Sequence, residues 1–145
     1  LIFLPIIGLY FLKGGSIPIN RSNSLDSLKK MSKMAKKAIK KGRSILIFPQ
    51  GTRVPVYSST RDYPYLAGVF FLYSQCKIPV VPVAHNAGLF WPKNSFIKFP
   101  NNLKSKTVTI KLLDEIPIGL NKNDFLKELE SKTEKETNIM IDKEI

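Results

Sequence analysis

An apolar run changes into a polar turn within the stretch Ile45-Leu46-Ile47-Phe48-Pro49-Gln50-Gly51-Thr52-Arg53. Ile45 to Phe48 is a continuous apolar run of strand length, which predicts a buried β-strand. Pro49 to Thr52 stops that strand, and Gly51 permits a close approach of the backbone. Thr52 offers a hydroxyl and Arg53 a planar fork that suits phosphate. Because α/β proteins place ligands in loops at strand ends, the stretch predicts an anion site; the alternative is a strand-end turn with a solvated arginine.

Helices and strands are expected to alternate on both sides of this stretch. Apolar residues recur at helical spacing from Leu25 to Ile39, with Ser24 as the expected cap and Gly42 as the expected end. A long loop is expected over 53–64. Further helices are predicted over 67–76 and 123–137, and further strands over 78–84 and 107–113. Pro79 and Pro82 restrict the second strand to an end, an edge or a bulge. The fold class is therefore α/β, with a central, mostly parallel or mixed sheet flanked by helices.

The chain has 145 residues and a mass of 16.4 kDa, which is the size of one domain. We expect a single domain over residues 1–145, with a core over 1–120 and a solvated C-terminal helix over 121–145. The single cysteine excludes an intrachain disulfide. With one histidine and one cysteine, no metal site is expected.

Positive charge is concentrated in the first four-fifths of the chain. Residues 1–113 carry a net charge of +16 and residues 114–145 carry −4, giving +12 in total. This balance indicates a polyanionic partner, such as nucleic acid, anionic lipid or a phosphorylated substrate. Much of the charge is a lysine face opposite the apolar face of the first predicted helix. That face is interpreted either as a solvated surface or as a membrane-binding surface, because it lacks interleaved aromatics and any nucleic-acid motif.

Three ordered blocks resemble the 1-acylglycerol-3-phosphate (lysophosphatidate) acyltransferases of the glycerophospholipid acyltransferase superfamily. Phe48-Pro49-Gln50-Gly51-Thr52-Arg53 is similar to the Phe-Pro-Glu-Gly-Thr-Arg signature of that family. Gly15 to Arg21 is similar to an upstream block that ends in arginine. Ile78 to Ala84 resembles a downstream apolar block with its proline, and the similarity continues over 85–91. The resemblance covers roughly residues 1–113 and implies a glycerolipid acyltransferase-like fold.

The resemblance implies a set of substrate-binding residues. Arg21 and Arg53 are expected to hold the phosphate of the acceptor, because arginine binds phosphate through two parallel hydrogen bonds. Gln50, Gly51 and Thr52 are expected to shape that pocket, and Pro82 to lie in the strand beside the acyl donor. The implied reaction transfers an acyl group from acyl-CoA or acyl carrier protein to the sn-2 hydroxyl of 1-acylglycerol 3-phosphate, which makes phosphatidate. No cofactor is expected beyond the acyl thioester co-substrate.

The family's His-x4-Asp block, which carries the general base, has no counterpart in this chain. The only histidine is His85, and the residue five positions later is Phe90. His85 is therefore interpreted as a structural or pocket-lining residue, and the missing block is expected upstream of Leu1. Two substitutions also depart from the family pattern: Gln50 stands for the usual glutamate, and Asn20 stands where aspartate is common. A lysine common after the signature has no clear counterpart.

The resemblance also implies where the protein works and what it contacts. The expected partners are a lysophospholipid acceptor, an acyl-CoA or acyl carrier protein donor and an anionic membrane surface, without nucleic acid. The expected location is the cytoplasmic face of a membrane, the inner membrane in a bacterium. The alternative function is a non-catalytic basic module that binds anionic membrane or nucleic acid, in which the lysines form one surface and the two arginines lie apart.

Overall fold

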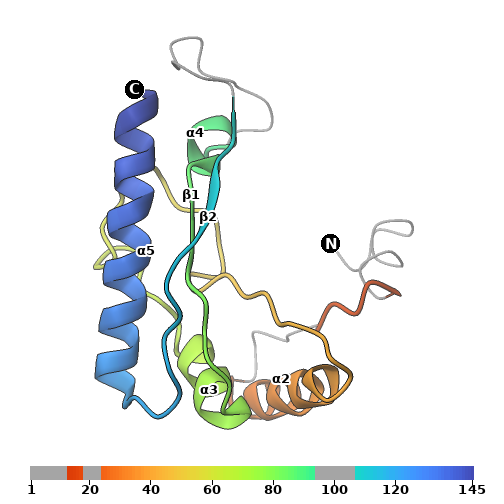
Figure 1. Ribbon diagram of the computed structural model, residues 1–145. Coiled ribbons are helices and arrows are strands. Elements are labelled where there is room, and N and C mark those ends of the chain that lie inside the picture. Colours follow the sequence, from red (N-terminus) through yellow and green to blue (C-terminus); the bar gives the residue numbers. More distant parts are fainter. Residues whose placement is uncertain (1–12, 18–23, 94–106) are drawn as a thin grey trace. The chain divides into compact units, whose positions relative to one another are not determined.

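The computed structural model describes residues 13–17, 24–93 and 107–145. The chain divides into two compact units, residues 1–46 and 47–145. Helix α2 (Ser24–Ile39) belongs to the first unit. The second unit contains α3 (Ala67–Cys76), β1 (Val83–His85), α4 (Ala87–Phe90), β2 (Ile110–Leu112) and α5 (Lys122–Glu144) (Figure 1). This mixture of helices and strands is consistent with the expected α/β class.

Helix α2 is amphipathic, as its sequence predicts. Met31 and Ala35 are buried, and the lysines of the opposite face are exposed. Leu25, which the pattern assigns to the inner face, is instead 68% exposed, because it lies in the first turn before the buried stripe begins. The helix ends at Ile39, and the predicted terminating residue Gly42 lies in the turn that follows, with a φ of +73°, the left-handed conformation that glycine adopts readily. The amides of Gly42 and Arg43 bond to the carbonyls of Ile39 and Ala38, which caps the last turn.

The prediction of a buried strand over Ile45–Phe48 is wrong. Residues 43–48 form no ladder with any described residue, and Leu46 and Phe48 are 76% and 66% exposed. Ile47, by contrast, packs against the core of the second unit. The run is therefore a single unpaired segment whose alternate residues are half-buried. An apolar run of strand length cannot distinguish this arrangement from a strand that is covered on both faces.

The described sheet has two antiparallel strands, and the central, mostly parallel or mixed sheet that was expected is not found among the described residues. Strands β1 and β2 pair with Val83 opposite Leu112 and His85 opposite Ile110. Ala84, on the face toward α5, is fully buried, while Ile110 and Leu112 are largely exposed. The predicted strands over 78–84 and 107–113 therefore occur as short segments that pair with each other.

Proline shortens the first of these strands. Val80 and Ile116 form a separate two-hydrogen-bond bridge, with N···O distances of 3.0 and 2.7 Å. Between that bridge and the pair Val83–Leu112 the register changes by one residue, so 113–115 accommodates a bulge. Pro82 lies at the transition, buried, and its carbonyl accepts the amide of Leu113 at 2.9 Å. This agrees with the restriction of Pro82 to a strand end or bulge, because proline has no N–H to donate.

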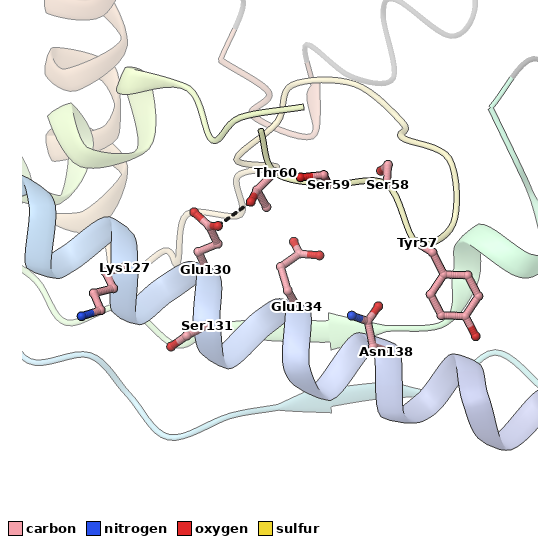
Figure 2. Close-up of a pocket in the computed structure, with 9 residues that line it drawn as sticks. All are labelled: Tyr57, Ser58, Ser59, Thr60, Lys127, Glu130, Ser131, Glu134 and Asn138. Carbon is pink, nitrogen blue, oxygen red and sulfur yellow. Dashed lines mark hydrogen bonds between the residues drawn. The ribbon is translucent and has the colours of Figure 1, made fainter. Parts of the chain in front are cut away.

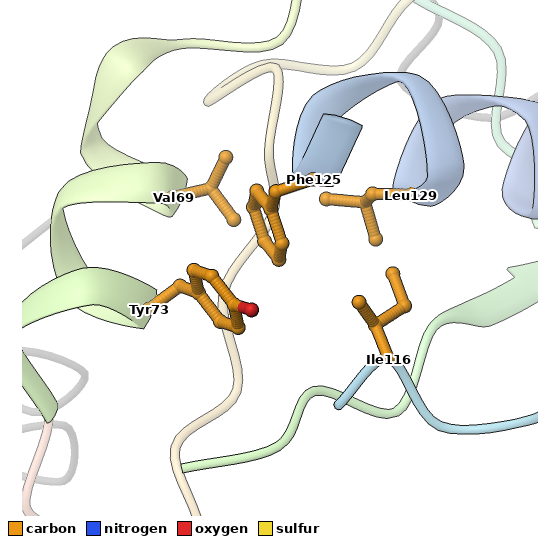
Figure 3. Close-up of a cluster of buried hydrophobic side chains, with 5 residues drawn as sticks. All are labelled: Val69, Tyr73, Ile116, Phe125 and Leu129. Carbon is orange, nitrogen blue, oxygen red and sulfur yellow. The ribbon is translucent and has the colours of Figure 1, made fainter. Parts of the chain in front are cut away.

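The core of the second unit forms where α3, α5 and the segment after β2 meet (Figure 3). The rings of Tyr73 and Phe125 stack with centroids 4.0 Å apart, and Phe125 and Ile116 are fully buried. The buried hydroxyl of Tyr73 donates to the carbonyl of Pro117 at 2.6 Å and accepts the amide of Leu120 at 2.9 Å. The one polar atom in this contact is therefore satisfied, so its burial carries little desolvation cost.

Helix α5 contributes to the core, and it extends beyond the predicted end at residue 137. Phe125 and Leu129 belong to the core cluster, and Ile141 packs with Leu89 and Phe90 of α4. The core therefore does not stop at residue 120, and only the outer face of this helix is solvated. None of the helices in the described ranges is long and apolar enough to cross a bilayer.

Candidate functional site

The signature stretch forms a tight turn. The amide of Gly51 donates to the carbonyl of Phe48 at 3.0 Å, so residues 48–51 form a β-turn with Pro49 at its second position. Proline is favoured at that position because its ring fixes φ near the value that the turn requires. Gly51 has a φ of +65°, which a side-chain-bearing residue adopts only with strain. The turn thus presents Thr52 and Arg53, both exposed, to solvent.

Two hydrogen bonds fasten this turn to the start of α3. The amide of Leu66 donates to the carbonyl of Pro49 at 2.9 Å, and the side-chain amide of Gln50 donates to the carbonyl of Tyr63 at 3.2 Å. An ionised glutamate has no hydrogen to donate, so it could not make the second bond. Glutamine at position 50 therefore makes a hydrogen bond to the loop that the usual glutamate of the signature could not make. The sequence alone did not show this bond.

The guanidinium of Arg53 is held by residues almost forty positions later. Its Nη1 donates to the carbonyl of Pro92 at 3.2 Å, and its Cζ lies 5.2 Å from the centroid of the Trp91 ring. The tryptophan face attracts the cation, and among the described residues the guanidinium makes one hydrogen bond, so other donors remain for a ligand. The sequence-predicted anion ligand is thus oriented while its charge stays exposed.

A buried asparagine fixes the segment that carries Trp91. Asn86 is 1% exposed. Its side-chain Oδ1 accepts the backbone amide of Thr109 at 2.8 Å, and its backbone amide donates to the carbonyl of Thr109 at 3.3 Å. Helix α4 follows immediately, with Leu89 and Phe90 packed on Ile141 of α5. These contacts anchor the short helix on both sides, so that Trp91 at its end is positioned for Arg53.

Lys93 provides a second cation at the same loop, and the sequence analysis missed it. Its Nζ lies 4.4 Å from the centroid of the Tyr63 ring and donates to the Tyr63 hydroxyl at 3.3 Å. Tyr63 also accepts the hydrogen bond from Gln50, so Lys93 and the signature turn meet at one residue. The signal that could have identified it is its place after the aromatic segment 85–91, although nothing in the local pattern shows a contact with residue 63.

A polar groove lies between α5 and residues 57–60, which belong to the loop that follows Arg53 (Figure 2). It has a volume of about 580 Å³, and Glu130 and Glu134 project into it from α5. Arg53 is not among its lining residues. Two carboxylates repel a phosphate, so this groove does not suit the anion that the signature turn predicts.

Hydroxyl groups on the loop donate to carboxylates on α5 at three places. Thr60 donates to Glu130 at 2.5 Å, Tyr65 to Glu134 at 2.8 Å and Tyr57 to Asp142 at 2.6 Å. Burial, followed by the charge of Glu134, raises the pKa of Tyr65, and the hydrogen bond to Asp142 raises the pKa of Tyr57. Both phenols are therefore neutral donors at physiological pH, and they fix the loop along the length of α5.

The structure brings together only part of the predicted site. Gln50 and Gly51 lie in the turn over residues 48–51, and Thr52 and Arg53 follow it directly. Pro82, by contrast, is buried immediately before β1, and its carbonyl accepts the amide of Leu113. Arg21 and Asn20 lie outside the described residues, so the expected pairing of Arg21 with Arg53 stays a prediction. His85 is exposed on β1 and does not line the groove.

The comparison with protein families bears on this turn directly. A family model described as acyltransferase matches residues 1–86 of the chain, which include the whole signature stretch. The chain belongs to this acyltransferase family. The family assignment agrees with the three ordered blocks from which the resemblance was inferred.

Curated proteins with similar sequences carry one recurring name. The chain is 36% identical over 104 residues to a 1-acyl-sn-glycerol-3-phosphate acyltransferase of Pseudomonas aeruginosa, covering 72% of this chain and 39% of that protein. It is 32% identical over 122 residues to the human 1-acyl-sn-glycerol-3-phosphate acyltransferase beta, covering 81% of this chain and 40% of that protein. It is 28% identical over 117 residues to a 1-acyl-sn-glycerol-3-phosphate acyltransferase of Cocos nucifera, covering 80% of this chain and 35% of that protein.

The chain therefore spans about two-fifths of the length of the curated relatives that it matches. No solved structure matches it.

Proposed function

We propose that the whole protein transfers a fatty acyl group from an acyl thioester to the sn-2 hydroxyl of 1-acylglycerol 3-phosphate, which yields phosphatidate. The observation that carries this proposal is the exposed Arg53 guanidinium, which Trp91 and Pro92 hold at the signature turn. Family membership and the names of the relatives support the same acceptor.

Arg53 is proposed to bind the phosphate of the acceptor. A guanidinium has five N–H donors, and one of them bonds to the carbonyl of Pro92. The remaining donors can form the two parallel bonds that arginine makes with phosphate. Trp91 limits the rotation of the side chain, so less conformational entropy is lost when the phosphate binds. Lys93 adds a second positive charge at the loop, and Arg21 is proposed as a further ligand.

The reaction balances as a simple acyl transfer. A base removes the proton of the acceptor hydroxyl, the oxygen attacks the thioester carbonyl, the carbon–sulfur bond breaks, and the protonated thiol leaves. We propose that the base is the family's His-x4-Asp pair. His85 does not suit the role, because it lies exposed on β1 with Phe90 five residues later.

Several features of the working protein belong to this proposal. The donor is acyl-CoA or acyl carrier protein, used as a co-substrate, and no resident cofactor takes part. The protein acts at the cytoplasmic face of a membrane whose lipids are partly anionic. The two-stranded sheet is proposed to belong to a larger central sheet of glycerolipid acyltransferase type, which would cover the exposed residues of β2.

The test measures thiol release from acyl-CoA with lysophosphatidate, using protein expressed from the complete reading frame. Arg53→Ala should raise KM for lysophosphatidate and lower kcat/KM by about 10- to 100-fold, since a charge-assisted hydrogen bond to phosphate is lost. Arg53→Lys should recover only part of the loss, because lysine is a point charge without a fork. Arg61→Ala is the matched control, since Arg61 is an exposed arginine on the same loop.

Two results would overturn the proposal. The first is an absence of acyl transfer by the unsubstituted protein with any glycerophospholipid acceptor. The second is an equal loss of kcat/KM in Arg53→Ala and Arg61→Ala, which would show that the loop responds to any loss of charge. An unchanged KM with lower kcat in Arg53→Ala would move Arg53 from acceptor binding to another role.

A further inference from the structure

Helix α2 has a continuous surface of lysine side chains. Seven lysines, all exposed, follow one side of the helix and its C-terminal turn: Lys29, Lys30, Lys33, Lys36, Lys37, Lys40 and Lys41. At about 100° per residue they fall within an arc of about 140°. The buried residues Met31, Ser32 and Ala35 lie outside that arc. We call these seven residues the lysine face.

Acidic residues are scarce on the helix that carries the lysine face. Asp26 is the single acidic residue of α2 and lies in its first turn, whereas Lys36 and Lys37 lie in its last turn. The capped end at Gly42 keeps Lys40 and Lys41 on the same helical surface as the lysines of the earlier turns. Neighbouring lysines at three- and four-residue spacing repel one another. This arrangement costs stability in the isolated protein and becomes favourable beside an anionic surface.

We propose that the lysine face docks α2 onto the headgroups of anionic glycerophospholipids in a bilayer. This inference rests on the proposed function, which places both the acceptor and the product among anionic lipids. Clusters of four to eight lysines on one helix typically bind anionic membranes, at about 1 kcal/mol for each lysine near the surface. The apolar side of α2 is buried in the protein, so docking is electrostatic and needs no insertion of the helix.

The composition of the lysine face favours a bilayer over a macromolecular partner. An interface with an acidic protein normally has aromatic residues or arginine at its centre and is depleted in lysine. Single-stranded nucleic acid requires aromatic stacking platforms, and base recognition in duplex DNA commonly combines lysine or arginine with asparagine or glutamine. Helix α2 contains no aromatic residue, arginine, asparagine or glutamine. Flexible point charges along a rod-like surface match a plane of mobile headgroups, which has no fixed shape to complement.

The experiment measures binding of the 145-residue chain to sedimented vesicles. Phosphatidylcholine vesicles are compared with vesicles that also contain phosphatidylglycerol, and with vesicles that contain phosphatidate. The chain should bind both anionic preparations, and binding should weaken as salt is added. The triple variant Lys33→Gln, Lys37→Gln, Lys40→Gln should bind about 100-fold more weakly, at about fivefold for each lysine.

A matched control removes the same net charge elsewhere. The triple variant Lys122→Gln, Lys135→Gln, Lys143→Gln changes three exposed lysines of α5 and should retain most of the binding. Circular dichroism checks that both triple variants keep their helices. Equal losses in the two triple variants would overturn the proposal, because net charge alone would then explain binding. Absence of binding to both anionic preparations would also overturn it. So would tighter binding of acyl carrier protein or duplex DNA with the same dependence on Lys33, Lys37 and Lys40.

Failure of docking and failure of the proposed reaction give different results. If docking fails, the α2 triple variant and the unsubstituted protein bind vesicles equally, while acyl transfer to detergent-dispersed lysophosphatidate continues. If the proposed reaction fails, acyl transfer is absent, while binding to anionic vesicles still depends on the lysine face. Arg61→Ala should bind vesicles like the unsubstituted chain, because it removes an exposed arginine and leaves the lysine face intact.

Discussion

Helices α5 and α2 carry charge in opposite ways. On α5, three carboxylates accept hydrogen bonds from hydroxyls of residues 57–65, which we call the signature loop: Glu130, Glu134 and Asp142. These carboxylates therefore make contacts within the protein. On α2, the lysine face is exposed, and Asp26 is the one acidic residue of the helix. The first arrangement holds a loop in place, and the second leaves charge for a partner. The comparison separates charge that supports the fold from charge that is available for binding.

The strongest test of this contrast removes a buried apolar side chain from α5 and an exposed one from α2. Phe125→Ala should lower the free energy of unfolding by about 3–5 kcal/mol, because it empties a fully buried site stacked on Tyr73. Leu25→Ala on α2 should change it by less than about 0.5 kcal/mol, because Leu25 is 68% exposed. Urea denaturation followed by circular dichroism measures both. Similar losses would show that α2 supports the fold as strongly as α5.

The next effect concerns the hydroxyl–carboxylate bonds. Tyr65→Phe should destabilise the protein by about 1–2 kcal/mol at neutral pH, because it removes the bond to Glu134. The raised pKa of Tyr65 adds a pH dependence: its contribution is complete below the unfolded tyrosine pKa of about 10 and is lost as the pH rises above that value.

Urea midpoints at neutral and alkaline pH check both parts of this prediction. The variant Tyr65→Phe should lose less stability between the two conditions than the unsubstituted chain does. Tyr57→Phe is the control, since Tyr57 is 55% exposed and its bond to Asp142 competes with water. If Tyr57→Phe had the larger effect, burial would not be what makes these bonds stabilising.

A smaller loss is expected at the capped end of α2. Gly42→Ala should cost about 1 kcal/mol, because alanine is strained at a φ of +73° even though its Cβ would meet no atom within 4 Å. Gly42→Asn should cost less, since asparagine tolerates this conformation. Thermal denaturation of the two variants gives the order. A neutral Gly42→Ala substitution would mean that the cap does not hold the last lysines in place.

The smallest effects should have opposite signs on the two helices. Lys33→Gln should raise the free energy of unfolding by a few tenths of a kcal/mol, because it relieves repulsion from Lys29 and Lys37. Lys132→Gln should lower it by a similar amount, because Lys132 pairs with Glu128 at 2.9 Å. Both changes should diminish at high salt. A loss of stability in Lys33→Gln would indicate that this lysine has a partner within the protein.

Local patterns predicted the helices well. The bounds of α3 match the predicted range 67–76, because the segment ends where Lys77 enters the left-handed conformation. The start of α5 at Lys122 lies within one residue of the predicted start at 123. Its end was placed seven residues early, because Met140 and Ile141 are buried only through contacts that a helical pattern does not reveal.

Contacts between distant residues could not be predicted. The segment Ile45–Phe48 has the composition of a buried strand, but composition does not show whether another strand lies beside it. The signature identified Arg53, whereas Trp91, Pro92 and Lys93 were not assigned to the site. Their contacts join residues 30 to 39 positions apart, and the resemblance to a family describes motifs without stating which of them touch.

The three bonds between the signature loop and α5 also constrain how related sequences can change. Each bond joins a hydroxyl at position 57, 60 or 65 to a carboxylate at position 142, 130 or 134. Loss of one partner leaves the other without its bond, so replacements should occur in pairs across homologues. Position 65 should covary with 134 more strongly than 57 with 142, because Tyr65 is the more buried phenol. Changes in the loop would then be accompanied by changes in α5, about 70 to 85 residues later in the sequence.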